Sequence, residues 1–233
     1  MALLSTTTLT QITQAIKVAK LFGVETLIVD VDKIRGVNNA RTIGIYDENL
    51  SIDIEGSIGI NRIDVLSNRL SLLEGKSDYV VDCVIDEKTG DTKSLVMKTN
   101  RAKVEYRCAR LKSMKAPNKI DDRIYKFEID EDVVSILTRA DSAMRADTLC
   151  ILCDDNNITY QFMDANGDVF QYESATKMIN LIDDAPINMV REYPVKLIML
   201  AIKNNTTGNF YITEKKVFNA DINGINVYIT SKQ

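Results

Sequence analysis

Apolar and polar residues alternate over short runs through most of this chain, and turn-forming residues separate the runs. Alternation with a period of two, rich in Val, Ile, Thr, Tyr and Phe, predicts β-strands with one buried face. Gly-containing turns at 88–91, 166–167 and 206–209 indicate antiparallel hairpins. The predicted strands are 26–32, 33–38, 41–47, 51–55, 78–86, 92–100, 102–109, 124–129, 148–154, 157–163, 168–173, 195–203, 209–216 and 225–230.

Three segments instead place apolar residues at helical spacing, behind residues that cap helices. The segment 9–22 follows a Ser/Thr run, 62–73 follows Asn61, and 131–145 follows Asp130. A shorter helix is predicted at 186–192, ending before Pro194. Strands with a few interspersed helices give the fold class α+β.

The order of these elements repeats. The offset between the first and third helices nearly equals the offset between the second and fourth, so each half consists of helix, strands, helix, strands. Between the halves, 110–123 has no periodicity, contains Pro117 and is rich in basic residues. The sequence therefore predicts an N-terminal domain over 1–109, a connector over 110–123 and a C-terminal domain over 124–233.

Length and composition suit a soluble globular protein. The chain has 233 residues, 45% of them apolar, enough for a buried core in each of two small domains. No apolar run approaches the ~18 residues that a membrane span needs, and the N-terminus lacks the pattern of a secretory signal. We expect an intracellular, cytoplasmic protein without a membrane partner.

Composition also argues against an enzyme. Histidine is absent, which excludes Ser-His-Asp and Cys-His catalysis. Cys150 and Cys153 have the spacing of half a zinc site but no second pair, and we interpret them as reduced structural residues. The run 164–168 is similar to the start of a calcium loop, but Glu173 falls short of the last ligand position, so a hairpin turn is the better interpretation. We expect no metal site, while carboxylate and lysine chemistry stays open on composition alone.

The net charge of −4 matters less for nucleic-acid binding than the positions of the charges along the helices. An acidic chain is not expected to bind nucleic acid, yet a protein that surrounds DNA needs only a basic inner wall. The polar faces of 9–22 and 131–145 carry small, uncharged or basic side chains without an acidic centre, which suits loose phosphate contact. An ordinary solvated face is the alternative. The candidate DNA contacts are Lys17, Lys20, Arg139 and Arg145, with Arg69 of the second helix a weaker one because it projects toward the apolar edge.

Several segments, scattered over about 9–230, carry a resemblance to a known family. They are 63–70, 103–107, 116–119, 127–130, 196–200, 209–211 and 226–229. Together they resemble the DNA sliding-clamp family, which includes PCNA and the trimeric clamps of T4-type bacteriophages. The length and the short fourth helix resemble the phage clamps more, and for a phage protein the expected location is the bacterial host cytoplasm. In this family six similar domains, each with inner helices packed on outer antiparallel sheets, close a ring around double-stranded DNA, so the resemblance implies a homotrimer of two-domain chains. The family uses no catalytic residues and no cofactor.

The resemblance also implies partners and sites. A DNA polymerase would be tethered to DNA independently of sequence, and an ATP-dependent clamp loader would open the ring. Arg191, on the predicted fourth helix, would face DNA. Polymerase would dock beneath the connector at Leu111, Met114, Ile120 and Tyr228; anchoring the connector to the core is the alternative role for these side chains. Subunits would pair through strands 102–109 and 168–173, with Val104 and Tyr106 on one and Val169, Phe170 and Tyr172 on the other.

Two other classes of protein remain open. One is a monomeric accessory protein that binds DNA on an open face, which would need a denser basic patch. The other is a β-rich viral structural protein, which has no reason to keep acidic residues off its helix faces. The mass in solution separates a trimer from a monomer.

Overall fold

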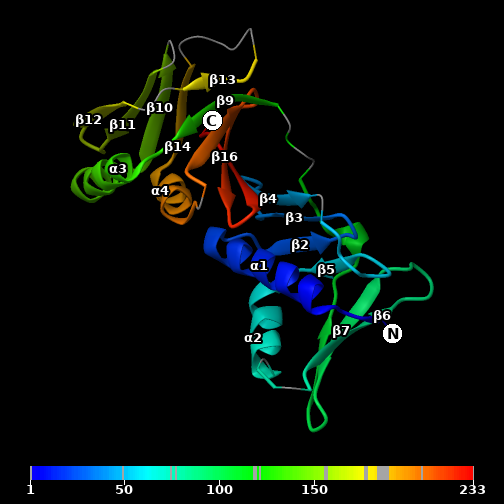
Figure 1. Cartoon of the computed structure of the whole chain (residues 1–233). Helices are drawn as coiled ribbons and strands as arrows, with labels where there is room; N and C mark the ends of the chain where they lie inside the picture. Colours follow the sequence, from blue (N-terminus) through cyan, green and yellow to red (C-terminus); the bar gives the residue numbers. More distant parts are fainter. Residues whose placement is uncertain are drawn as a thin grey trace. The chain divides into compact units, whose positions relative to one another are not determined.

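The computed structural model describes residues 2–48, 50–73, 75–76, 78–117, 120, 122–154, 157–175, 178–182, 189–205 and 207–232. Within these residues the chain divides into two compact units, Met1–Asn118 and Lys119–Gln233. Each unit combines helices with mainly antiparallel sheets, which confirms the predicted α+β class (Figure 1).

The first unit places two helices on one curved sheet, in the strand order β1-β6-β7-β5-β2-β3-β4, with β8 also paired to β7. Helix α1 packs on β2 and β3, α2 packs on β7 and β8, and the two helices contact each other (Figure 1). The elements are β1 (Ala2–Leu3), α1 (Thr6–Phe22), β2 (Thr26–Val29), β3 (Lys33–Val37), β4 (Ile43–Glu48), β5 (Ile58–Ile60), α2 (Ile63–Leu73), β6 (Val80–Ile85), β7 (Thr92–Lys98), β8 (Lys103–Arg107) and the 3₁₀ turn η1 (Leu111–Ser113).

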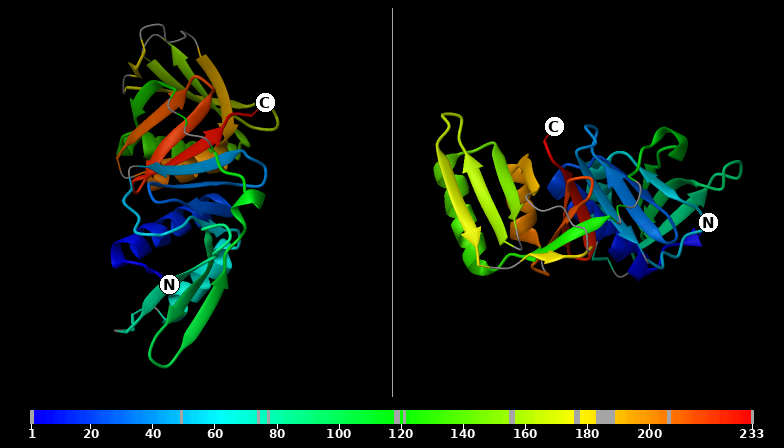
Figure 2. Two further views of the ribbon diagram at one scale, coloured as in Figure 1. Left: turned by 90° about the vertical axis from the view of Figure 1, so that its right-hand side faces the viewer. Right: turned by 90° about the horizontal axis from the view of Figure 1, so that it is seen from above.

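The second unit has two sheets, in the orders β17-β16-β15-β9-β13 and β12-β11-β10-β14. Helix α3 packs on β11 and β12, and α4 packs beside it on β10 and β14 (Figure 2). The elements are β9 (Arg123–Glu128), α3 (Glu131–Met144), β10 (Thr148–Asp154), β11 (Asn157–Met163), β12 (Val169–Ser174), β13 (Ile179–Asn180), β14 (Met189–Pro194), α4 (Val195–Asn204), β15 (Asn209–Thr213), β16 (Val217–Ile222) and β17 (Ile225–Thr230).

Local chemistry explains the ends of the long helices. The Ser5 hydroxyl accepts a hydrogen bond from the Thr8 N–H at 3.1 Å, so α1 begins three residues before the predicted start. Gly23 ends α1 in the left-handed conformation at φ 67°. The Asp130 carboxylate caps α3 by accepting from the Val133 N–H at 2.8 Å.

The prediction was wrong around Pro194. The described part of the predicted helix 186–192 is strand β14, in which Met189 and Tyr193 are buried and the residues between them are not; 186–188 lie outside the described residues. The predicted strand 195–203 is helix α4, which buries Val195, Ile198, Met199 and Ile202. That spacing is helical, and Pro194 precedes it where no helical N–H is needed.

None of the described helices is long and apolar enough to cross a membrane.

Candidate nucleic-acid interface

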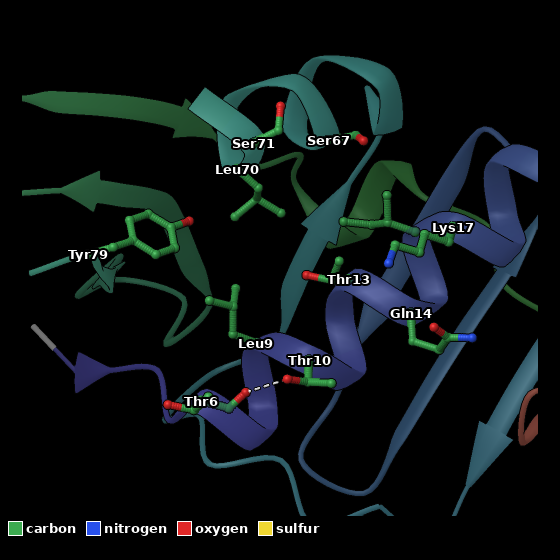
Figure 3. Close-up of a pocket in the computed structure, with 11 residues that line it drawn as sticks. Thr6, Leu9, Thr10, Thr13, Gln14, Lys17, Ser67, Leu70, Ser71 and Tyr79 are labelled. Carbon is green, nitrogen blue, oxygen red and sulfur yellow. Dashed lines mark hydrogen bonds between the residues drawn. The ribbon is translucent and has the colours of Figure 1, made fainter. Parts of the chain in front are cut away.

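A groove with a volume of ≈ 520 Å³ lies between α1 and α2 (Figure 3). Its floor is apolar, with Leu9 and Leu70, and its walls carry hydroxyl groups from both helices. Lys17 projects into it from α1, and no described lining residue has a carboxylate. Hydroxyl groups with one cation can donate to phosphate oxygens. The wall residues with hydroxyls are Thr6, Thr10, Thr13, Ser67 and Ser71, besides Tyr79.

Lys20, at the edge of the same surface, forms an ion pair with Asp64 of α2, with 3.2 Å between ammonium nitrogen and carboxylate oxygen. The lysine side chain is 39% exposed and that of the aspartate 80%. Asp64 therefore neutralises part of the charge that Lys20 contributes.

Arg69 turns away from this surface. Its Nη1 donates to the Glu105 carbonyl oxygen of β8 at 2.5 Å, and its guanidinium lies 6.0 Å from the centroid of the Tyr106 ring. This agrees with its direction on the helical wheel, where it projects to the apolar edge. The guanidinium group of Arg69 therefore binds the sheet on which α2 packs.

Arg139 is exposed on α3, beside the exposed Ser135 and Ser142. Arg145 is also exposed, but it is the C-cap of the helix, with φ 49° and its N–H bonded to the Asp141 carbonyl. The acidic residues of the first turn, Glu131 and Asp132, lie at the opposite end, where the helix dipole favours them.

Helix α4 adds two cations that the sequence analysis missed. Lys196 and Lys203 are exposed and seven residues apart, so they lie on the same side of the helix. α1 and α4 contain no Asp or Glu. The signal was present as lysines at i and i+7 around apolar residues at helical spacing, but the segment was interpreted as a strand. Arg191, placed on a helix by the prediction, lies on β14 opposite Ile151.

The two strands predicted to join subunits are both at sheet edges. Within the described residues β8 pairs with β7 alone and β12 with β11 alone (Figure 2). Val104 is half-buried, Val169 is 51% exposed, and Phe170 and Tyr172 are half-buried. Tyr106 is fully buried under α2, so its side chain belongs to the core of the first unit and only its strand can take part in an interface.

Backbone hydrogen bonds show which groups of these edges face outward. The Cys108 N–H donates to the Lys93 carbonyl at 3.0 Å and the Thr99 N–H to the Ala102 carbonyl at 2.8 Å, so the even-numbered residues of β8 face β7. The Asp164 N–H donates to the Asp168 carbonyl at 3.0 Å, so the backbone groups of even-numbered residues of β12 likewise face β11. Since antiparallel backbone groups alternate, the outward N–H and C=O groups belong to odd-numbered residues: Lys103, Glu105, Arg107, Val169, Gln171 and Glu173.

The predicted partner-docking residues divide between the units, with Leu111 and Met114 in the first and Ile120 and Tyr228 in the second. Met114 lies against Gly59 of β5, where an added Cβ would come within 2.8 Å of its sulfur. Met114 therefore anchors the connector to the sheet, one of the two roles considered for it. Leu111 and Ile120 are half-exposed, and Tyr228 is 5% exposed.

The four cysteines are free thiols. Burial raises the pKa of Cys153 to about 12 and also raises the pKa of Cys150. A thiol that stays protonated at neutral pH is a poor nucleophile and a poor metal ligand.

No protein-family model matches the sequence, and no curated sequence matches it. Solved structures do match the fold. The beta clamp of H. pylori, in complex with 5-chloroisatin, has a TM-score of 0.70 and 11% identity, covering 96% of this chain and 62% of that one. PCNA from Entamoeba histolytica has a TM-score of 0.59 and 14% identity, covering 95% of each chain. A. fulgidus PCNA, bound to the C-terminal region of FEN-1, has a TM-score of 0.64 and 10% identity, covering 99% of this chain and 98% of that one.

The protein therefore has the DNA sliding-clamp fold, as the sequence pattern predicted. The chain spans less than two thirds of the beta clamp but nearly all of either PCNA.

Proposed function

We propose that the chain is one subunit of a DNA sliding clamp, a homotrimeric ring that encircles double-stranded DNA and tethers a DNA polymerase to it. The observation that carries this proposal is the charge of the helices. In a chain with a net charge of −4, α1 and α4 have no carboxylate and expose lysines. A protein that slides needs phosphate contacts without base readout, and isolated cations among small polar side chains supply them.

The proposed DNA contacts differ in how free each side chain is to bind a phosphate. Lys17, Arg139, Lys196 and Lys203 are exposed and have no ion-pair partner among the described residues. Lys20 and Arg69 have intramolecular partners, Arg145 ends a helix, and Arg191 lies on a strand. We rank the first four as the principal contacts and the other four as secondary.

Ring closure uses the β8 edge of one copy and the β12 edge of the next. This contact is head-to-tail, because the two edges differ, and a head-to-tail contact closes into a ring when the rotation fits. Two units per chain and six domains per ring then require three copies. The outward backbone groups of odd-numbered residues on both strands have the alternation that an antiparallel ladder needs.

Partner proteins complete the proposal. A polymerase docks at the half-exposed Leu111 of the connector, while Met114 anchors the connector to its sheet. A. fulgidus PCNA with its bound FEN-1 region supports peptide docking on this fold. An ATP-dependent loader opens the ring, and the clamp needs no catalytic residue or cofactor of its own.

Topology gives the decisive experiment. The protein is incubated with nicked circular plasmid and passed over a sizing column, and half of the complex is cut once with a restriction enzyme. We expect retention on the circle, release after cutting, and recovered retention when proteins block both new ends. Equal retention on open linear DNA contradicts the ring and favours the open-face accessory protein.

A second experiment tests the DNA-binding side chains. Replacing Lys17, Arg139, Lys196 and Lys203 with Ala should flatten the plot of log affinity against log salt by about 0.9 for each phosphate that is no longer bound. The control replaces Lys112 and Lys115 of the connector, both exposed, and should leave the slope unchanged. If the connector variant changed the slope and the helix variant did not, the helices would not be the DNA surface.

A further inference from the structure

Two arginines, Arg62 just before α2 and Arg69 within it, bind two of the outward carbonyls of the β8 edge. Arg69 Nη1 donates to the Glu105 carbonyl oxygen at 2.5 Å, and Arg62 Nη2 donates to the Arg107 carbonyl oxygen at 3.1 Å. Both carbonyls belong to odd-numbered residues, which face away from β7. The outward N–H groups of Lys103, Glu105 and Arg107 have no partner within the described part of the chain.

Tyr106 holds the two arginines in place between these carbonyls. Their guanidinium carbons lie 5.2 Å (Arg62) and 6.0 Å (Arg69) from the centroid of its ring, within the range of a cation–π interaction. The ring is fully buried, and its hydroxyl oxygen accepts from the Arg62 backbone N–H at 3.3 Å. Contacts with a buried ring therefore hold both arginine side chains next to the β8 edge.

A strand that joins this edge must offer N–H groups to the same two carbonyls. Hydrogen bonds from a charged donor are roughly twice as strong as neutral ones, so the guanidinium groups compete well with a neighbouring backbone. The edge keeps its donors, but two of its three outward acceptors, the carbonyls of Glu105 and Arg107, are occupied, which protects it from unintended strand pairing in the free subunit.

We propose that Arg62 and Arg69 form a gate that weakens strand addition at the β8 edge, so that the joint between subunits can open. The proposal rests on the proposed ring, in which the strand that the gate opposes is β12 of a second copy. Charge favours that occupant over a second β8: besides the two arginines, β8 carries two cations, Lys103 and Arg107, against one acid, Glu105, whereas β12 carries Glu173 and no Lys or Arg. On binding, the N–H groups of β12 take the carbonyls and the guanidinium groups withdraw to the Tyr106 ring.

The test replaces both arginines with Met, which keeps a long side chain over Tyr106 and removes the donors. Sedimentation velocity across a concentration series measures the subunit dissociation constant. Because two hydrogen bonds no longer have to be displaced, association should tighten about tenfold. Arg69→Met alone, which leaves the start of α2 intact, should give part of the gain. The control, Lys88→Met with Arg101→Met, removes the same charge from exposed turns and should match the wild type.

Association that is unchanged or weaker in folded Met variants overturns the gate. If the wild type assembles and the Met variants do not bind more tightly, only the gate fails. If the wild type and all variants sediment as 26.2 kDa monomers throughout, the ring fails with it.

Discussion

The ammonium group of Lys20 lies 3.2 Å from the carboxylate of Asp64 and joins α1 to α2, each residue three positions along its helix from a residue of the hydroxyl-lined groove, Lys17 and Ser67. Both side chains are exposed, and such pairs contribute about 0–1 kcal/mol to stability. The pair matters more for binding, because it places one acid on an otherwise acid-free part of the proposed DNA surface.

Asp64→Asn should therefore strengthen DNA binding. Lys20 is released for a phosphate, so affinity at low salt should rise a few-fold and the salt slope should steepen by up to about 0.9. Fluorescence anisotropy with a short duplex over a salt series measures both. Glu87→Gln makes the same charge change in an exposed hairpin turn. An equal gain in both variants would assign the effect to net charge and remove Lys20 from the surface.

A charge exchange tests the subunit interface and its register. Antiparallel pairing with Lys103 opposite Glu173 sets Glu105 against Gln171 and Arg107 against Val169, so no like charges meet. Lys103→Glu or Glu173→Lys alone should weaken the trimer, by roughly 0.2–1 kcal/mol at each of its joints. The combined variant should recover the wild-type dissociation constant in sedimentation velocity. Absence of recovery in the combined variant would show that these two positions do not face each other.

Arg145 offers a test of backbone strain. It ends α3 at φ 49° and ψ 35°, a left-handed conformation that costs a residue with a Cβ about 1 kcal/mol. Arg145→Gly should raise the free energy of unfolding by about 0.5–1 kcal/mol, measured by urea denaturation. Ser135→Gly, in the exposed middle of the same helix, should lower it by about 0.5 kcal/mol. A destabilised Arg145→Gly would mean that the arginine side chain contributes more than the strain costs.

Buried thiols predict how stability depends on pH. Burial raises the pKa of Cys83 to about 11 and the pKa values of Cys108 and Cys153 to about 12, from an ordinary value of 9.0. Above pH 9 these thiols ionise in the unfolded chain but stay protonated in the folded one, so folding stability should fall as the pH rises from 9 toward 12. Urea denaturation at neutral pH and at about pH 10.5 measures the decline. Cys153→Val should make it shallower; a stability that rises over this range would contradict the assignment.

The regular patterns of the chain were sufficient for part of the fold. α1 and α3 were predictable because their apolar residues recur at helical spacing over three or more turns and because Ser5 and Asp130 cap them. β8 and β12 were predictable from alternation and from their turns. α4 was not, because a short, almost wholly apolar run fits a buried helix and a buried strand equally well. β14 was not, because its buried residues Met189 and Tyr193 are four apart, a spacing that fits one face of a helix or of a strand. Lys196 and Lys203 were missed with α4.

The sequence by itself determined where most strands and long helices begin and end, since caps, turns and periodicity act between near neighbours. Only the tertiary structure decided what the polar side chains do. The partners of Arg69 and Arg62 lie 36 and 45 residues away along the chain, and no local pattern encodes them. Whether a basic residue faces solvent, an acid or a strand edge depends on how a helix packs on its sheet, and that packing is set by the whole buried surface rather than by the residues beside it.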